Sequence, residues 1–256
     1  MLFYDLETSF SRKRKDALII EIGAVRGERT FHRLVNPIPP GENLRSVLKT
    51  QDHKKTYRWW KKLLGEKGYL INDMESLENT ILGFTPEGEA VQELILFGEG
   101  LEFCAHNGKC FDHPILSSAL AREGLDPPPF LDSLPMLRRS FDFPKNSLGY
   151  LYAHLFEESF RAHHALDDAQ ALKRVVESCA LRKGTTVRDL WERTVPLESI
   201  RGIGRATKLK IQAEGLENAE QLLEWVKEHD SDDWRDTFSH LHRYKKLGKY
   251  LYGKRW

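Results

Sequence analysis

The chain has 256 residues, of which 40% are hydrophobic and 30% are charged, and its formal net charge is +1. These values are typical of a globular protein, and no apolar run approaches the roughly 18–20 residues of a membrane span, so we expect no membrane partner. The charge is uneven, because residues 181–256 carry 16 Lys and Arg against 12 Asp and Glu, a mildly basic balance compatible with nucleic acid.

The first elements are expected to be strands. Residues 3–7, residues 17–25 and residues 30–35 are short segments of aliphatic and β-branched residues, and "NPIPP" ends the third. The short loops between them predict an antiparallel meander. The following segment, residues 44–70, is basic and aromatic and has no clear assignment.

Helices and strands then alternate. We predict a helix over residues 85–99, opening at Thr85 with Pro86 as its first helical residue. A fourth strand covers residues 101–107. Further helices are expected at four places: residues 113–124 (from Pro114 to Gly124), the segments "FLDSLPMLRR" and "SLGYLYAHLF", and residues 165–184. The order predicts an α/β fold with a mixed sheet flanked by helices.

Two acids lie on the first predicted strand, where Asp5 and Glu7 are one residue apart. Strand side chains repeat with period two, so both carboxylates share one face while Leu6 points to the other. Burying such a pair is costly without a partner, whereas a divalent cation with oxygen ligands makes it favourable. The pair alone leaves open a solvent-exposed strand end and half of a metal site.

Two further acids head apolar stripes on predicted helices, which places them inward. At helical spacing, apolar residues follow each acid: Leu116, Ala119 and Leu120 after Asp112, and Leu172, Val175, Val176 and Cys179 after Asp168. Asp167 lies about 100° round the helix from its neighbour and falls off the stripe. Four inward acids indicate one shared metal site.

A histidine precedes the last of these acids. His163 lies five residues before Asp168, in the loop that enters the helix. Imidazole can take a proton from water near neutral pH, which suits a general base. His164 is the alternative at this point.

Three motifs in this order resemble those of the DEDDh 3′→5′ exonucleases, a family of the ribonuclease H-like superfamily. They are Asp5-Leu6-Glu7 followed by Thr8, a strand and "AHN" leading to Asp112, and His163-x-Ala-x-x-Asp168. With "IIEIGAV" and "LVNP" they cover about residues 1–180. Within the family, "AHNGKCFDHPIL" and "NSLGYLYAHLF" are most similar to the three-prime repair DNA exonucleases and to the exonuclease-like domains of the promyelocytic leukaemia protein group.

The third motif selects His163 over His164. The resemblance departs from the family at one place, because no "GI[ST]" turn follows the third strand and the basic segment 44–70 stands there instead.

The resemblance implies a ribonuclease H-like fold and hydrolysis with two divalent ions, Mg²⁺ or Mn²⁺. The implied ligands are Asp5, Glu7, Asp112 and Asp168. His163 is the implied catalytic base, and the products are nucleoside 5′-monophosphates. Two ions about 3.5–4 Å apart assist the attacking water and the leaving 3′-oxygen.

Three other residues are candidates for substrate contact by the same resemblance. Leu6 and Thr8 flank the acids, and Leu6 is expected either to wedge against a terminal base or to pack in the core. Asn107 is expected to bind a terminal sugar or phosphate, or to hold the turn before Asp112.

The C-terminal part resembles a helix-hairpin-helix module, in which backbone N–H groups at a helix start face a nucleic-acid phosphate. Its hairpin is "GIG" at 202–204, and the candidate DNA-binding residues around it are Arg201, Gly202, Gly204, Arg205 and Lys208. A small helical bundle is the alternative. We therefore divide the chain into an exonuclease domain (1–180), a linker (181–196) and a small all-α domain with a basic tail (197–256).

The run "KKTYRWWKK" at 54–62 mixes cations with aromatic rings. Such a run either follows a nucleic-acid strand by stacking on its bases or forms a helix that buries Tyr57, Trp59 or Trp60. The sequence does not decide between these two.

The predicted function is a metal-dependent 3′→5′ exodeoxyribonuclease that acts on single-stranded or frayed DNA ends. An exoribonuclease is the first alternative, because no motif reads the 2′-hydroxyl, and a catalytically silent nucleic-acid-binding module is the second. The three cysteines are odd in number and lack metal-ligand spacing, and the start of the sequence lacks a signal-peptide pattern. We therefore expect a cytoplasmic or nuclear protein.

Overall fold

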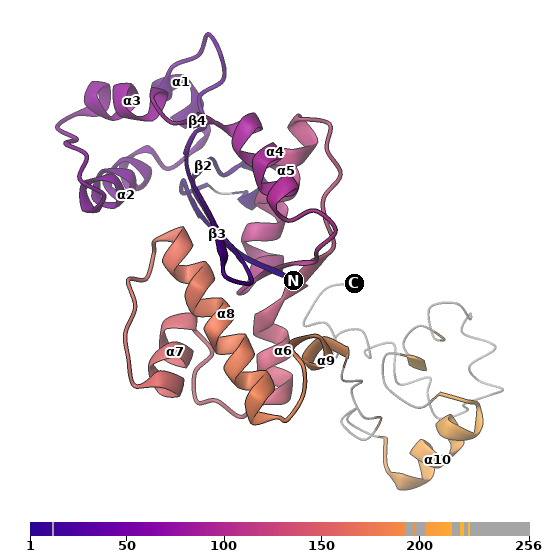
Figure 1. Cartoon of the computed structure of the whole chain (residues 1–256). Coiled ribbons are helices and arrows are strands. Elements are labelled where there is room, and N and C mark those ends of the chain that lie inside the picture. The colour runs from indigo at the N-terminus through magenta and orange to yellow at the C-terminus, as the bar shows by residue number, and fades with distance from the viewer. Residues whose placement is uncertain (12, 193–196, 198–202, 217–220, 223–224, 226–256) are drawn as a thin grey trace. The chain divides into compact units, whose positions relative to one another are not determined.

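The computed structural model describes residues 1–11, 13–192, 197, 203–216, 221–222 and 225 (Figure 1). The chain divides into two compact units, Met1–Val187 and Arg188–Trp256. This division falls inside the segment that the sequence suggests as a linker.

The first unit is built on a six-stranded sheet with the order β4-β3-β2-β1-β5-β6. Its strands are β1 (Leu2–Thr8), β2 (Ile19–Arg26), β3 (Arg29–Asn36), β4 (Thr85–Pro86), β5 (Phe103–Ala105) and β6 (Phe130–Asp132). The meander β1-β2-β3 is antiparallel, whereas β4 pairs parallel with β3, and β5 and β6 continue the sheet in parallel from β1. The predicted mixed α/β sheet is therefore confirmed.

Helices cover both faces of this sheet (Figure 1). On one face Leu2, Tyr4 and Leu6 join a core with side chains of α4 (Glu87–Phe97) and α5 (Asp112–Arg122). The long helix α8 (Ala165–Arg182) packs on β1 and β2, with α7 (Leu148–Phe156) beside it. Because strand side chains alternate, the odd-numbered positions of β1, including both acids, face α8.

The apolar stripes on α5 and α8 are confirmed. Every apolar member is buried: Leu116, Ala119 and Leu120 on α5, and Leu172, Val175, Val176 and Cys179 on α8. Asp112 is also buried, and Asp168 is partly buried. The stripes therefore carry these two acids inward, as the periodicity predicts.

Three predicted boundaries are wrong. Thr85–Pro86 is strand β4, because Val35 pairs with Thr85, and the helix begins only at Glu87. Phe130–Asp132 is likewise strand β6 and not helix, and α6 (Ser133–Ser140) follows it. Helix α5 begins at Asp112, two residues before the predicted start at Pro114. Two-residue and three-residue strands are too short to show a period of two in the sequence.

The segment without assignment forms helices. It contains α1 (Leu44–Val47), the 3₁₀ turn η2 (Leu48–Thr50) and α2 (His53–Glu66), and α3 (Met74–Leu82) follows. Together they enclose a second apolar cluster with the fully buried Trp60 at its centre.

In the second unit the structure describes α9 (Val187–Glu192, which starts at the division) and α10 (Arg205–Ala213). Ile211 of α10 is buried. Of the predicted third helix the structure describes residues 221, 222 and 225 as helical, with Leu222 buried, and the basic tail lies outside the described residues. In the described part of the chain, no helix combines the length and the apolar character needed to cross a membrane.

Candidate metal centre and active site

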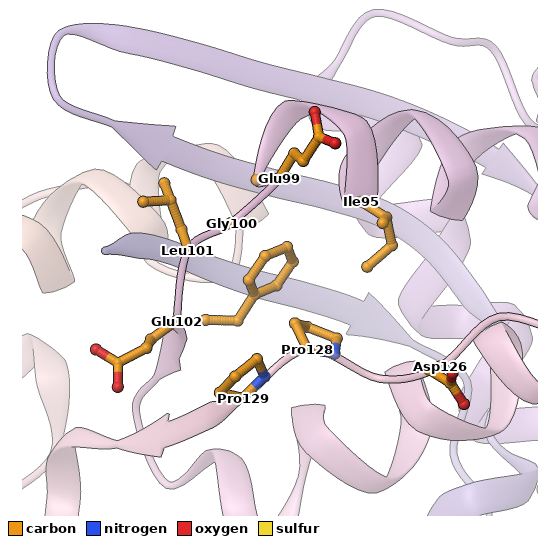
Figure 2. Close-up of a pocket in the computed structure, with 10 residues that line it drawn as sticks. Ile95, Glu99, Gly100, Leu101, Glu102, Asp126, Pro128 and Pro129 are labelled. Carbon is orange, nitrogen blue, oxygen red and sulfur yellow. The ribbon is translucent and has the colours of Figure 1, made fainter.

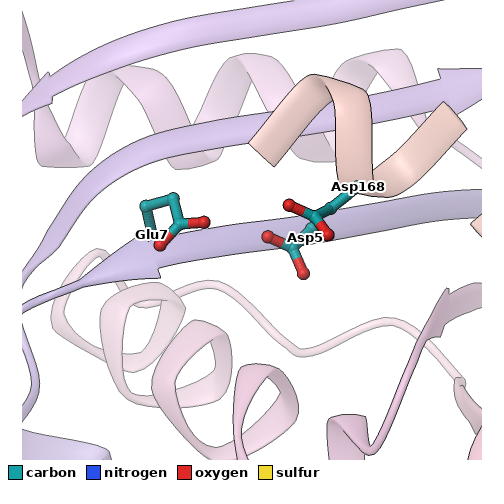
Figure 3. Close-up of side chains that lie close together, drawn as sticks. All are labelled: Asp5, Glu7 and Asp168. Carbon is teal, nitrogen blue, oxygen red and sulfur yellow. The ribbon is translucent and has the colours of Figure 1, made fainter. Parts of the chain in front are cut away.

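Three carboxylates converge between β1 and the first turn of α8. Ligand atoms of Asp5, Glu7 and Asp168 all lie within 4.8 Å of one another. Figure 3 shows Asp5 and Glu7 on the strand, with Asp168 reaching them from the helix above. Residues 163 positions apart in the sequence thus form one oxygen-rich cluster, and the chain folds so that two independent elements supply it.

Asp112, the fourth predicted ligand, is buried behind β1. Its Oδ1 accepts a hydrogen bond of 3.1 Å from the backbone N–H of Leu6. It is not part of the 4.8 Å cluster, but its charge raises the pKa of Asp5. The fold therefore places all four acids at one end of β1, with Asp112 held by the backbone between Asp5 and Glu7.

The acids raise one another's pKa values. Burial and the charges of Asp112, Asp168 and Glu7 raise the pKa of Asp5 well above its usual range. Burial is also the largest cause for the other three, raising the pKa of Glu7 to about 9, of Asp112 to about 7 and of Asp168 to about 6. A cluster of this kind favours a bound cation, since protons or a divalent metal must offset the repulsion. Hard oxygen ligands fit Mg²⁺ or Mn²⁺.

The stability of the metal-free protein is expected to fall as the pH rises from about 5 to about 9. A carboxyl whose pKa is raised in the folded state contributes its stability below the unfolded pKa and loses it as the pH rises through the folded pKa. Here the folded values reach about 6, 7 and 9. Melting temperatures in EDTA across this range test the prediction, and Mg²⁺ should flatten the curve. A melting temperature that rises from pH 5 to pH 9 would contradict it.

Gly23 of β2 lets α8 come close enough to deliver Asp168. It pairs with Asp5 across β1 and β2, and a Cβ at this position would lie 2.1 Å from the backbone nitrogen of Leu166. Only glycine allows such contact between strand and helix backbone. The sequence analysis missed this role, although an isolated glycine inside an apolar strand is a signal for close backbone approach.

Gly23→Ala is expected to destabilise the protein by about 1–3 kcal/mol, the usual cost of overpacking, and to weaken metal binding. The added methyl group must push the start of α8 away, which separates Asp168 from Asp5. Gly149→Ala on α7 is the matched control, because its Cβ would meet nothing within 4 Å. Thermal melts with and without Mg²⁺ measure both effects, and equal behaviour of the two variants would refute the role of Gly23.

The two neighbouring histidines have different environments. His163 is exposed, adopts a left-handed backbone (φ 67°) and meets Trp59 edge-on, with ring centroids 5.8 Å apart. His164 is buried, with Nδ1 3.1 Å from the Lys67 ammonium and Nε2 3.0 Å from Glu66. Since a lysine ammonium only donates, Nδ1 accepts and Nε2–H donates. His164 is thus occupied by protein partners, and His163 is the one that faces solvent.

The side chain of Asp168 holds the backbone of the loop that carries His163 and His164. Asp168 Oδ2 accepts hydrogen bonds from the N–H of His163 at 2.7 Å and of His164 at 3.1 Å. These bonds satisfy two donors ahead of the first turn of α8. The side chain of Asp168 and the position of His163 are therefore fixed together.

A buried ion pair between Glu21 and Lys67 lies next to Glu7 of the acidic cluster. Glu21 stands opposite Glu7 in the sheet, and its Oε1 is 2.7 Å from both Lys67 Nζ and His32 Nε2. Burial acts to raise the pKa of Glu21, but these hydrogen bonds outweigh it and lower the pKa. The charge of Lys67 also lowers the pKa of Glu7. This pair could not be predicted from the sequence, because Lys67 lies in the segment 44–70, which has no clear assignment there.

The predicted substrate-contact residues have other surroundings. Leu6 is buried in the core with α4 and α5, which favours packing over contact with a base. Thr8 is partly buried and donates to the Ser9 carbonyl at 3.3 Å. Asn107 has a left-handed backbone (φ 59°) at the start of the 3₁₀ turn before Asp112, a conformation that asparagine tolerates, which favours its role in the turn.

The predicted DNA-binding residues lie in the second unit. Arg201 and Gly202 are outside the described residues. Gly204 is the N-cap of α10, Arg205 is its first residue and Lys208 lies within it. This placement of Gly204 before a helix start is the one that a helix-hairpin-helix requires, and DNA binding here stays a prediction.

A pocket elsewhere on the first unit lacks the converging acids of this site. Its volume is about 320 Å³, and it is lined by Ile95, Gly98, Glu99, Gly100, Leu101, Glu102, Phe103, Asp126, Pro128 and Pro129. Figure 2 shows its acids Glu99, Glu102 and Asp126 spread around the rim instead of converging. None of them belongs to the acidic cluster.

Comparison with known proteins gives the same assignment as the site. A family profile described as exonuclease (RNase T) matches residues 2–176. Among solved structures, the chain is similar to E. coli Exonuclease I in complex with a dA16 oligonucleotide, with a TM-score of 0.52 and 14% identity over 75% of this chain and 42% of that chain. A zinc-bound complex of E. coli Exonuclease I with single-stranded DNA gives 0.53 and 14% over 78% and 44%. No curated protein sequence matches the chain.

The structural likeness at this low identity shows the fold, which is the ribonuclease H-like fold of the exonucleases. This chain spans less than half of the length of the Exonuclease I chains. The family profile, by contrast, covers more than half of this chain, and it covers all three motifs that carry the resemblance. The chain belongs to the DEDD exonuclease family.

Proposed function

We propose that the protein is a metal-dependent 3′→5′ exodeoxyribonuclease that releases nucleoside 5′-monophosphates from single-stranded or frayed DNA ends. The observation that carries this proposal is the convergence of Asp5, Glu7 and Asp168 within 4.8 Å at the exposed His163 loop. The complexes of Exonuclease I with a dA16 oligonucleotide and with single-stranded DNA support DNA as the substrate.

Each residue has a role that its surroundings support. Asp5, Glu7, Asp112 and Asp168 would hold two divalent ions, Mg²⁺ or Mn²⁺, which when bound offset the negative charge that develops during phosphodiester hydrolysis. His163 would take the proton of the attacking water. Asp168 keeps His163 at the cluster through its two hydrogen bonds to the loop backbone.

Digestion of end-labelled oligonucleotides tests this function. A 5′-labelled single strand incubated with Mg²⁺ should give a ladder that shortens from the 3′ end, and EDTA should abolish it. Parallel reactions with duplex DNA and with RNA of the same sequence determine substrate preference. Shortening from the 5′ end, internal cuts, or hydrolysis unaffected by EDTA would contradict the proposal.

A further inference from the structure

One face of α2 presents an aromatic ring between two cations beside the candidate base. Lys55, Trp59 and Lys62 are spaced i, i+4 and i+7, which places them on the same side of the helix. Trp59 meets His163 edge-on with an interplanar angle of 86°, and Lys62 Nζ lies 5.8 Å from the Trp59 ring centroid. Trp60, in contrast, is fully buried. Trp59 packs against the same apolar cluster but is only partly buried, so it is the tryptophan that keeps a surface beside His163.

A basic pocket continues this face toward the end of β1. It has a volume of about 630 Å³ and is lined by Phe10, Ser11, Arg14, Lys49, Gln51, Asp52 and Lys55. Its lining contains three cations and one carboxylate, and the Phe10 ring is 44% exposed. Phe10 lies three residues after Glu7 in the chain. An exposed ring and several cations thus lie directly beyond the acidic cluster.

Buried hydrogen bonds hold the pocket in shape. Ser9 Oγ donates to Gln51 Oε1 at 2.9 Å, and Gln51 Nε2 donates to the Asp16 carbonyl at 2.8 Å. The N–H of Phe10 donates to Thr56 Oγ1 at 3.1 Å. Ser9, Gln51 and Thr56 are all buried. Ser9 and Phe10 are therefore held against Gln51 and the first turn of α2, and the exposed Phe10 ring projects from this position.

The pocket is also connected to the second catalytic motif. The guanidinium of Arg14 lies 3.8 Å from the centroid of the Phe111 ring, and Phe111 directly precedes Asp112. Phe111 is 40% exposed. Arg14 is therefore held against the Phe111 ring, a contact that leaves guanidinium N–H groups available to bind a phosphate.

We propose that Phe10, Arg14, Lys49, Lys55 and Trp59, here called the α2 track, bind the nucleotides of a single strand that lie next to the one being cleaved. This rests on the proposed nuclease function and names the surface that holds its substrate. Aromatic rings stack on bases of any sequence, and cations beside them neutralise the phosphates. An acidic peptide would bind the cations but would leave the rings of Phe10 and Trp59 without a role. The bases of a duplex are paired and stacked, so they would not reach these rings.

Binding of a 5′-fluorescein oligothymidylate in EDTA tests the track without hydrolysis. Trp59→Leu keeps an apolar side chain but removes the stacking surface, so we expect about 10-fold weaker binding. Trp59→Phe keeps an aromatic ring and should restore most of the affinity. Unchanged binding by Trp59→Leu, or equal loss in both variants, would overturn the proposal.

The cations are tested by their salt dependence. The double variant Lys49→Gln/Lys55→Gln should reduce the slope of log K against log salt by about 1.4, since each phosphate contact on a single strand contributes about 0.7. Lys54→Gln removes one charge, one residue away from Lys55 and on another face of α2, and should leave the slope nearly unchanged. A fall of about 0.7 in the slope for Lys54→Gln would show that only the net charge matters and would overturn the track.

Two further measurements separate this proposal from the nuclease itself. The Lys49→Gln/Lys55→Gln variant should raise KM for single strands with little change in kcat, and a fall in kcat alone would overturn the track. The affinity for a DNA duplex of the same length should be unchanged by Trp59→Leu. Absence of any hydrolysis by the wild-type protein would refute the proposed function, while the binding measurements in EDTA would still decide the track.

Discussion

Replacing Asp5 by asparagine is expected to lower the rate of hydrolysis more than about 100-fold, since even residues that only orient metal ligands cost about 10–100-fold. The same change should raise the melting temperature of the metal-free protein. The pKa of Asp5 is raised well above its usual range by burial and by four neighbouring acids, so a neutral side chain of the same shape relieves repulsion. Loss of activity with a gain of stability is the signature of a charge kept for function.

Thermal melts with and without Mg²⁺ complete this experiment. Mg²⁺ should stabilise the wild-type protein by mass action and should stabilise Asp5→Asn much less. Asp167→Asn is the matched control, because Asp167 is not in the 4.8 Å cluster although it neighbours Asp168. Equal stabilisation of Asp5→Asn and the wild type by Mg²⁺ would argue against a metal site at β1.

Replacing His163 by asparagine is expected to lower kcat by about 10²–10⁴-fold, the usual contribution of general-base catalysis. Asparagine tolerates the left-handed backbone that His163 adopts (φ 67°), and its N–H can still donate to Asp168. The variant therefore removes the imidazole and leaves the loop in place. The measurement is the pH dependence of kcat, whose limb at low pH should disappear.

The control for this prediction is His164→Asn. This change breaks the contacts to Glu66 and Lys67, so we expect a loss of stability of about 1–3 kcal/mol and a smaller effect on kcat. If His164→Asn lost activity while His163→Asn kept it, the assignment of the third motif would be wrong.

The sequence predicted those parts of the site that a periodic pattern reveals. Alternation on β1 placed Asp5 and Glu7 on one face, and the apolar stripes on α5 and α8 placed Asp112 and Asp168 inward. Such patterns depend on local geometry, which a single sequence contains. The meander of β1, β2 and β3 was predictable for the same reason.

The contributions of α2 could not be predicted in this way. Lys67 and Trp59 reach the site only because α2 folds back over the start of α8, a contact between segments about 100 residues apart. The composition of residues 54–62 suits both a buried helix and a binding surface, and the structure shows buried Trp60 next to partly exposed Trp59. The role of Gly23 likewise depends on which helix crosses it. Its neighbours in the sequence do not contain that information.

The two hydrogen bonds from the loop to Asp168 have a consequence for cation affinity. Both bonds are accepted by Oδ2, and they fix the orientation of the Asp168 carboxylate before any ion binds. A preorganised ligand loses little rotamer freedom on binding, and its affinity then depends on the backbone of residues 163 and 164. Insertions or deletions in this loop should therefore change the metal concentration that the enzyme needs, even when every acidic residue is kept.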